Sequence, residues 1–259
     1  MQTLSRPWGA MHIRIDGPEN GPAVVFANSL GTDLRLWDAV LPLLPPGLRL
    51  IRYDKRGHGL SDLGGNASLD DLAADAIALI EATNAAPVIF VGLSIGGLIA
   101  QNVAARRPDL LRALVLSNTA ARLGTAESWQ ARIEAVRTQG LPAIADAVME
   151  RWFAPAFRVT PAVAPWRNML CRTPADGYIA ACNALAAADQ TAATAQLRLP
   201  TLVIAGDADG ASPPEIVQAT AALIPGAAFH IIEGAGHLPC VEAPDAWAAL
   251  LSPFLKAHS

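Results

Sequence analysis

The sequence predicts an α/β fold, in which a mostly parallel sheet is flanked by helices. Short apolar runs alternate along the chain with longer helix-like segments, as is typical of parallel strands joined by crossover helices. Most of these runs are continuously apolar, as expected of strands buried on both faces. The 259 residues, of which 52% are hydrophobic, are enough for a single domain with a substantial core.

Seven segments fit strands of this sheet. Polar and apolar residues alternate over residues 12–16, which predicts a half-exposed edge strand. Buried strands are expected over residues 23–27, 48–53, 88–93, 111–117, 201–205 and 228–232.

Three helices have recognisable boundaries. Ser68 is a candidate N-cap for a helix over residues 69–82. A second helix is expected over residues 95–106, and the last opens at Pro244 and runs toward Lys256.

The strand–helix rhythm fails over residues 121–195. This region is rich in Ala, Trp and Arg and contains no convincing strand. A helical insertion between two strands predicts a cap, placed after the sixth strand of the fold. We therefore divide the chain into a core of residues 1–120 and 196–259 and a cap of residues 121–195.

Charge and composition exclude several classes of partner. Charged residues make up 16% of the chain and the net charge is −4, so neither nucleic acid nor an anionic membrane is expected. Residues 83–105 carry no charge, but Asn84, Ser94 and three glycines interrupt the run. A strand, a turn and a helix explain this stretch better than a membrane span does.

Cysteine and histidine spacing argue against structural cross-links and metals. The three cysteines are far apart and form no C-x-x-C pair, which predicts reduced thiols in a cytoplasmic protein. Residues 1–10 have no apolar run of signal-peptide type. No two histidines have the spacing of metal ligands, so we expect neither a metal nor another cofactor.

The most informative segment is G-x-S-x-G at residues 92–96, between a predicted strand and a predicted helix. This context predicts a nucleophilic Ser94 presented at a sharp turn, as in the α/β-hydrolase fold. Such a turn crowds its neighbours, so Gly92 and Gly96 have a steric reason to be glycine. The alternative is a glycine-rich turn in which the serine is a bystander.

A serine nucleophile needs a base, and the base needs an acid to orient it. His237 follows the last strand, where the chain order Ser, acid, His places the base. Of the other candidates, His230 fits a structural residue inside a strand, and His58 lies in a tight turn. We predict Asp209 as the acid, and Asp207 as a turn-capping residue, although Asp207 remains the alternative.

Two backbone amides are predicted to form the oxyanion hole. One belongs to Ile95, which follows the nucleophile, and the other to Leu30, in the loop after residues 23–27. The alternative for the second is an ordinary polar turn.

Several segments resemble the 3-oxoadipate enol-lactone hydrolases, and the resemblance covers nearly the whole chain. The resembling segments are residues 28–33 (NSLGTD), 52–59 (RYDKRGHG), 92–97 (GLSIGG), 118–122 (NTAAR), 151–153 (RWF) and 177–178 (GY). The resemblance implies an α/β hydrolase that opens an enol-lactone ring in the β-ketoadipate route of aromatic catabolism. Asp209-Gly210 departs from the Asp-Pro that is common in that family.

The substrate that the resemblance implies is a small lactone carrying a free carboxylate. Arg132, close to Trp129 in the sequence, is a candidate to bind this group, and Trp129 and Trp152 are candidates to line the pocket. Further candidates are Arg122, Arg151 and Arg167. The alternative is that these arginines are solvated and that the aromatic residues form the core of the cap.

Rival functions use the same core. A general carboxylesterase, a carbon–carbon bond hydrolase or a perhydrolase would need the same three residues, and only the cap favours the lactone. A non-catalytic binding protein with this fold is the rival outside enzymes.

Overall fold

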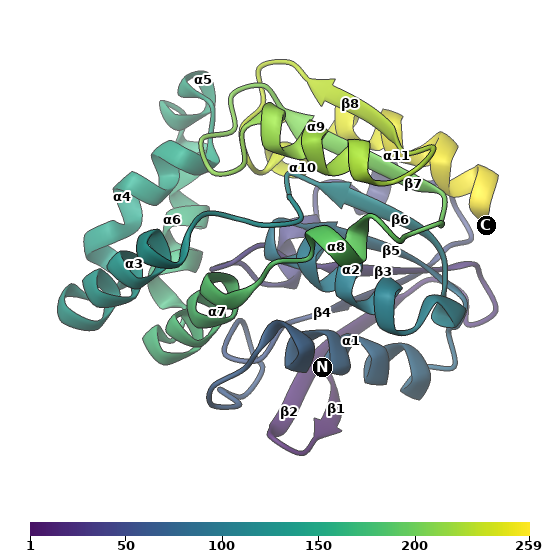
Figure 1. Ribbon diagram of the computed structural model, residues 1–259, viewed down its shortest axis with the longest axis horizontal. Coiled ribbons are helices and arrows are strands. Elements are labelled where there is room, and N and C mark those ends of the chain that lie inside the picture. The colour runs from purple at the N-terminus through teal and green to yellow at the C-terminus, as the bar shows by residue number, and fades with distance from the viewer.

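The computed structural model covers all 259 residues and contains one eight-stranded sheet (Figure 1). The strand order is β1-β2-β4-β3-β5-β6-β7-β8, and β2 alone runs antiparallel to the other strands, since it pairs antiparallel with both β1 and β4. The strands are β1 (Gln2–Arg6), β2 (Gly9–Asp16), β3 (Ala23–Ala27), β4 (Arg49–Tyr53), β5 (Val88–Leu93), β6 (Leu111–Ser117), β7 (Thr201–Gly206) and β8 (Ala228–Ile232).

Eleven α-helices and four short 3-10 helices complete the fold. The helices are α1 (Leu69–Ala82), α2 (Ile95–Arg106), α3 (Ala126–Gln139), α4 (Leu141–Trp152), α5 (Pro155–Arg158), α6 (Ala164–Arg172), α7 (Ala175–Ala187), α8 (Thr191–Thr194), α9 (Pro214–Leu223), α10 (Pro239–Glu242) and α11 (Pro244–His258). The 3-10 helices are η1 (Leu34–Trp37), η2 (Leu41–Leu43), η3 (Pro108–Leu110) and η4 (Pro161–Val163). None of the helices combines the length and the apolar character that crossing a membrane requires.

The α/β-hydrolase prediction is confirmed, and most of the predicted elements are present. Ser68 caps α1 as expected, since its hydroxyl accepts the Asp71 amide and the Asp71 carboxylate accepts the Ser68 amide. Residues 121–195 contain helices and no strand, and α3 to α8 lie between β6 and β7.

The predictions were wrong mainly at the two edges of the sheet. The exposed strand β1 was missed, and the strand predicted over 12–16 begins earlier, at Gly9. The prediction that residues 228–232 are buried was also wrong, because β8 is the last strand and pairs with β7 alone. His230 accordingly lies exposed on this strand rather than in the core.

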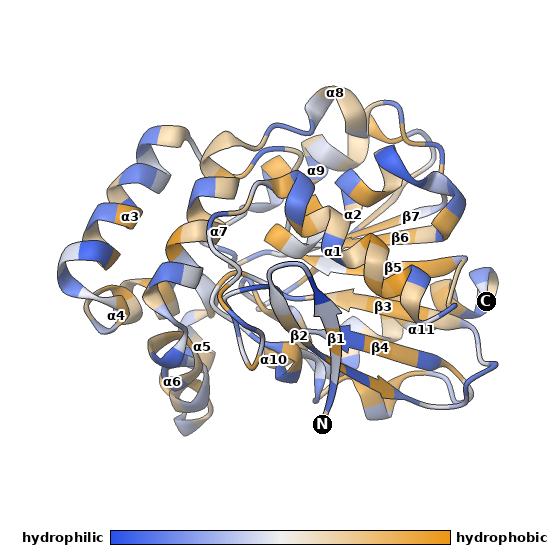
Figure 2. Cartoon of the chain, turned by 90° about the horizontal axis from the view of Figure 1, so that it is seen from below, coloured by the Kyte–Doolittle hydropathy of each residue, from blue (hydrophilic) through white to orange (hydrophobic).

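Helices cover both faces of the sheet. The central strands β3, β5 and β7 are buried at every residue, and β3 and β5 are largely orange in Figure 2. Helices α1, α2 and α9 cover one face. On the other face Trp37 of η1 and Trp247 of α11 are both fully buried, with ring centroids 5.6 Å apart.

Helices α3 to α7, which are inserted between β6 and β7, gather at one end of the sheet, at the left of Figure 1, whereas α8 packs against α2 and α9. They are tied to the loop after β8 through their backbone. The His237 amide donates to the Trp152 carbonyl at 2.7 Å, and the Glu242 carboxylate accepts the amides of Ala154 and Gly236. The insertion therefore closes over the carboxyl ends of the strands, where ligands bind in folds of this kind.

Candidate active site

Ser94 stands at the turn between β5 and α2. Its φ of 60° and ψ of −122° lie in a region that a residue with a side chain adopts only when its surroundings enforce it. The Ser94 amide donates to the Ser117 carbonyl at 3.1 Å, and the Thr119 hydroxyl donates to the Ser94 carbonyl at 2.7 Å. A Cβ on Gly92 would collide with the backbone of Gly96. The glycines thus permit the turn, and the neighbouring strand end holds it.

His237 and Asp209 form a buried pair next to this turn. Nδ1 of His237 lies 2.9 Å from Oδ2 of Asp209, and both side chains are almost completely buried. Burial acts to raise the pKa of Asp209, but the charge of His237 and the hydrogen bonds from His237 and Ser212 outweigh it and lower the pKa. The acid therefore stays ionised and accepts from Nδ1, which leaves Nε2 directed away from it.

The other nitrogen of this imidazole faces the pocket that contains Ser94. Nε2 of His237 lies 3.5 Å from the Ser29 hydroxyl, and Ser29, Ser94 and His237 all line the same pocket. An imidazole held at Nδ1 by a carboxylate and open at Nε2 can take a proton from a nearby hydroxyl.

The alternative candidates for acid and base lie elsewhere. Asp207 is exposed and accepts the Gly234 amide at 2.7 Å, which is the turn-capping contact expected of it. His58 is fully buried in the turn after β4, and burial, followed by the charge of Lys55, lowers its pKa well below the ordinary value.

The two predicted oxyanion amides are available as donors. Leu30 lines the pocket, and its amide has no acceptor within the chain. Ile95 is the first residue of α2, so no earlier carbonyl of the helix can accept its amide. Ile95 is fully buried and is not among the residues that line the pocket, so its part in an oxyanion hole stays a prediction.

Helices α3, α4 and α7, which belong to the predicted cap, contribute a second wall to the pocket. Trp129, Arg132 and Trp152 all line it, together with Arg151 and Tyr178. The Arg132 guanidinium lies 5.5 Å from the centroid of the Trp129 ring and donates to the Tyr178 hydroxyl at 3.3 Å.

Arg132 and Arg151 have no carboxylate partner in the chain, whereas the other two candidate arginines do. Arg122 lies 3.8 Å from Asp189, and Arg167 lies 2.6 Å from Asp146. Burial, and then repulsion from Arg132, lowers the pKa of Arg151. Two cations without a counter-ion beside a hydroxyl and an imidazole make the pocket suitable for an anionic substrate.

Several residues around the site were not predicted. Ser212 donates to Asp209 Oδ2 at 2.7 Å and lies 3.2 Å from His237 Nδ1, and Asn118 donates to the same carboxylate oxygen at 3.0 Å. Burial raises the pKa of Glu242, which accepts amides from the His237 loop and the cap. Position alone could have suggested Asn118, because it directly follows β6 at the strand edge where the site lies.

Comparison with known proteins identifies the family of this chain. A sequence model of the alpha/beta hydrolase family matches residues 24–250. The chain belongs to the α/β-hydrolase family.

This α/β hydrolase also has relatives similar along their full lengths. It is 35% identical to 3-oxoadipate enol-lactonase 1 of Acinetobacter baylyi, over 98% of this chain and 96% of that protein. An enol-lactonase from Burkholderia xenovorans superposes with a TM-score of 0.95 and 36% identity, over 98% of this chain and all of that one. A thermophilic esterase from Thermogutta terrifontis superposes with a TM-score of 0.92 and 29% identity over the whole of both chains. The resemblance to enol-lactonases inferred from the sequence is thereby confirmed.

Proposed function

We propose that this hydrolase opens the ring of 3-oxoadipate enol-lactone, using Ser94 as nucleophile, His237 as base and Asp209 as the acid that orients the base. The observation that carries the proposal is the composition of one pocket. It holds a serine in a strained turn and an acid-bound imidazole on the core side, and the unpaired cations Arg132 and Arg151 on the cap side. The similarity to enol-lactonases supports the choice of ring.

In the first half of the reaction, His237 Nε2 accepts the Ser94 proton as the oxygen attacks the lactone carbonyl. The tetrahedral oxyanion is stabilised by the amides of Leu30 and Ile95, each of which is worth about 3 kcal/mol in comparable sites. Collapse breaks the bond between the carbonyl carbon and the ring oxygen. The enol oxygen leaves with the proton held by His237, and the acyl chain remains on Ser94.

In the second half, His237 takes a proton from water as the water attacks the acyl-enzyme. The same two amides stabilise the second oxyanion, and the Ser94 oxygen leaves with the proton from His237. One water is consumed, and the enol rearranges to 3-oxoadipate. Throughout, the ionised Asp209 stabilises the transient imidazolium.

The cap explains why this substrate should be preferred to a neutral ester. The lactone carries a carboxylate on its acetate arm, and a partly buried anion needs cationic or amide donors. Arg132 and Arg151 supply two guanidinium groups on the wall facing Ser94. A charged hydrogen bond of this kind contributes roughly 1.5–3 kcal/mol.

The decisive experiment compares three substrates on the wild type and on Ser94→Ala. The substrates are 3-oxoadipate enol-lactone, α-angelica lactone (the same ring with methyl in place of the acetate arm) and p-nitrophenyl acetate. We expect kcat/KM for the first to exceed that for the second by about 10- to 100-fold, as one or two charged contacts imply. Ser94→Ala should keep its unfolding transition and lose at least about 10⁴-fold in kcat on every substrate.

Each rival function has its own outcome in this comparison. Equal rates on the two lactones with faster ester cleavage would indicate a general esterase. The similarity to the Thermogutta esterase supports this alternative. No turnover, with no labelling of Ser94 by a fluorophosphonate, would indicate a binding protein. Full activity in Ser94→Ala would refute the assignment of the nucleophile.

A further inference from the structure

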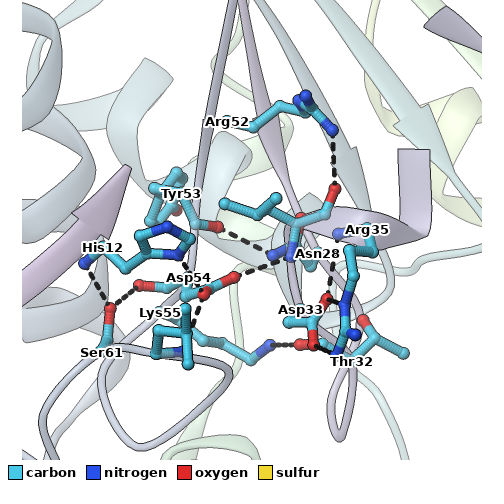
Figure 3. A network of polar contacts seen from close by, with 12 residues as sticks. His12, Asn28, Thr32, Asp33, Arg35, Arg52, Tyr53, Asp54, Lys55 and Ser61 are labelled. Atoms are coloured by element: carbon cyan, nitrogen blue, oxygen red, sulfur yellow. Dashed lines mark hydrogen bonds and ion pairs between the residues drawn. The ribbon is translucent and has the colours of Figure 1, made fainter. Parts of the chain in front are cut away.

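Lys55 is a buried cation behind the loop that carries the predicted oxyanion donor. The chain contains only two lysines, Lys55 and Lys256. Lys55 is 3% exposed and directly follows Asp54, just after the end of β4. Its ammonium donates to the carbonyl of Ser29 at 2.6 Å, with the carbonyl of Thr32 at 3.4 Å. In Figure 3 it reaches across to the loop that carries Asn28 and Thr32.

The contact to the Ser29 carbonyl acts on the predicted oxyanion donor directly. The Ser29 carbonyl and the Leu30 amide belong to one planar peptide unit, and in a trans peptide the C=O and N–H bonds point in opposite directions. A group that fixes the carbonyl on one side therefore fixes the N–H on the other. Leu30 lines the pocket, and its amide has no other acceptor in the chain.

A cation on the carbonyl also strengthens the amide as a donor. Hydrogen bonds in series polarise one another, and the effect grows in a site from which water is excluded. The Ser29 carbonyl accepts two further hydrogen bonds, from the Thr32 hydroxyl at 2.9 Å and from the Thr32 amide at 3.3 Å. The Leu30 N–H is thus the far end of a chain that begins at a buried charge.

The loop has other anchors, so Lys55 is not needed to close it. Asn28 donates to the Tyr53 carbonyl at 2.8 Å and accepts from the Trp37 indole at 2.6 Å. The Leu34 amide donates to Asp54 Oδ1 at 2.7 Å. These contacts anchor the loop without an ammonium group, whose burial costs several kcal/mol of desolvation free energy. Because the loop is already anchored, the burial of the Lys55 ammonium against it indicates a role in the reaction rather than in holding the loop.

We propose that Lys55 is a positioning residue that orients and strengthens the Leu30 amide as an oxyanion donor through the Ser29–Leu30 peptide unit. The inference rests on the proposed function only in that Leu30 is taken as an oxyanion donor. It does not depend on which ester or lactone is the substrate.

The surroundings of Lys55 make this role sensitive to pH. Burial lowers the pKa of Lys55 to about 7, against the attraction of Asp54 and Asp33. His58, on the turn that follows, is buried beside it, and its own lowered pKa keeps it uncharged. The ammonium therefore loses its charge just above neutral pH, and the donor strength of Leu30 should fall with it.

The test uses p-nitrophenyl acetate, a neutral ester that needs the oxyanion hole but not the arginines of the cap. We expect Lys55→Met to lower kcat about tenfold, less than the loss of a whole oxyanion donor, and to leave KM within about twofold. Affinity for a trifluoromethyl ketone, which forms an oxyanion on Ser94, should fall by the same factor. Lys256→Met, which removes the other, exposed lysine on α11, is the control and should match the wild type.

The pH profile separates positioning from a merely structural role. Wild-type kcat should decline above pH 7 toward the level of Lys55→Met, and the variant should lack this decline. Lys55→Arg, whose charge persists at all relevant pH values, should retain most of kcat and show no decline in kcat up to pH 9. A Lys55→Met variant with wild-type kcat and the same alkaline decline would overturn the proposal, as would a loss confined to KM.

A measurement on the wild type covers the case in which the variants do not fold. With ¹³Cε-labelled lysine the protein gives two signals, which Lys256→Met assigns. The Lys55 signal should titrate together with the alkaline decline in kcat, and midpoints more than about one pH unit apart would contradict the proposal. A wild type that cleaves the ester through Ser94 but leaves the enol-lactone intact would refute the proposed substrate, not the role of Lys55.

Discussion

The core side and the cap side of the pocket differ in how their polar groups are satisfied. On the core side Asp209 accepts five hydrogen bonds from within the chain, from Asn118 Nδ2, the Ala211 amide, the Ser212 amide, the Ser212 hydroxyl and His237 Nδ1. On the cap side Arg132 donates to one neutral hydroxyl, and Arg151 forms no ion pair.

This difference separates the two tasks of the site. A carboxylate whose oxygens are all occupied cannot move, and it holds the imidazole in one orientation and one tautomer. Guanidinium groups without partners are free to bind an anion when it arrives. Under the proposed function, the chemistry belongs to the core side of the pocket and the selectivity for a charged substrate to the cap side.

The largest expected effect tests the core side. In Asp209→Asn an amide would replace the carboxylate against His237 Nδ1, so the imidazole would lose its favoured tautomer and the stabilisation of its charge. We expect kcat to fall by about 10³- to 10⁴-fold on neutral and anionic substrates alike. Steady-state kinetics with p-nitrophenyl acetate and with the enol-lactone measure this.

The matched control is Asp207→Asn, two residues away on the same loop. Asp207 is exposed and contacts the Gly234 amide, which an asparagine oxygen can still cap. We expect less than a twofold change. If Asp207→Asn showed the large loss and Asp209→Asn did not, the two roles would be reversed.

A smaller and selective effect tests the cap side. Arg151→Met and Arg132→Met each remove one cation from the wall that faces Ser94. We expect each to lower kcat/KM for the enol-lactone by about 10- to 100-fold, the equivalent of one charged hydrogen bond. The rates on α-angelica lactone should change less than threefold, because that substrate has no carboxylate.

Arg122→Met is the control for these two variants. Arg122 belongs to the same part of the chain, but its partner is Asp189 and it does not line the pocket. It should behave as the wild type on both lactones. Equal losses on both lactones in the Arg132 and Arg151 variants would mean that they disturb the cap rather than bind the substrate.

The same division marks what could be predicted from the sequence. The core site follows from local rules, because a parallel sheet brings its carboxyl strand ends to one edge and the nucleophile turn has its own glycine pattern. Ser94, Asp209 and His237 could therefore be proposed without coordinates. The contacts of Ser212 and Lys55 could not, because they depend on loop conformations that no short motif encodes.

The cap is harder to predict because helix rotation decides which arginines face the pocket. Val148, Arg151 and Trp152 all line it, a spacing of three and four residues that places them on one face of α4. Arg151 and Trp152 are three and four residues after Val148, whereas Arg122 and Arg167 lie outside this helix. The burial of β8 was mispredicted because its sequence is apolar, whereas its exposure depends on its position as the last strand of the sheet.

The smallest expected effect tests the cost of the buried charge on the core side. The pKa of Lys55 falls from 10.5 to about 7, chiefly through burial. Between these values the unfolded chain holds a proton that the folded protein has released, so stability from this group increases with pH. Relative to Lys55→Met, the wild-type free energy of unfolding should rise by up to about 1.4 kcal/mol per pH unit above pH 7.

Urea unfolding of both proteins at pH 6, 7, 8 and 9 measures this difference. Over the same range, kcat of the wild type on p-nitrophenyl acetate should decline, because the ammonium that strengthens the Leu30 amide is being lost. Stability and activity would then change in opposite directions with the titration of one side chain. A constant stability difference across this range would show that Lys55 keeps its charge, and the decline in activity would need another titrating group.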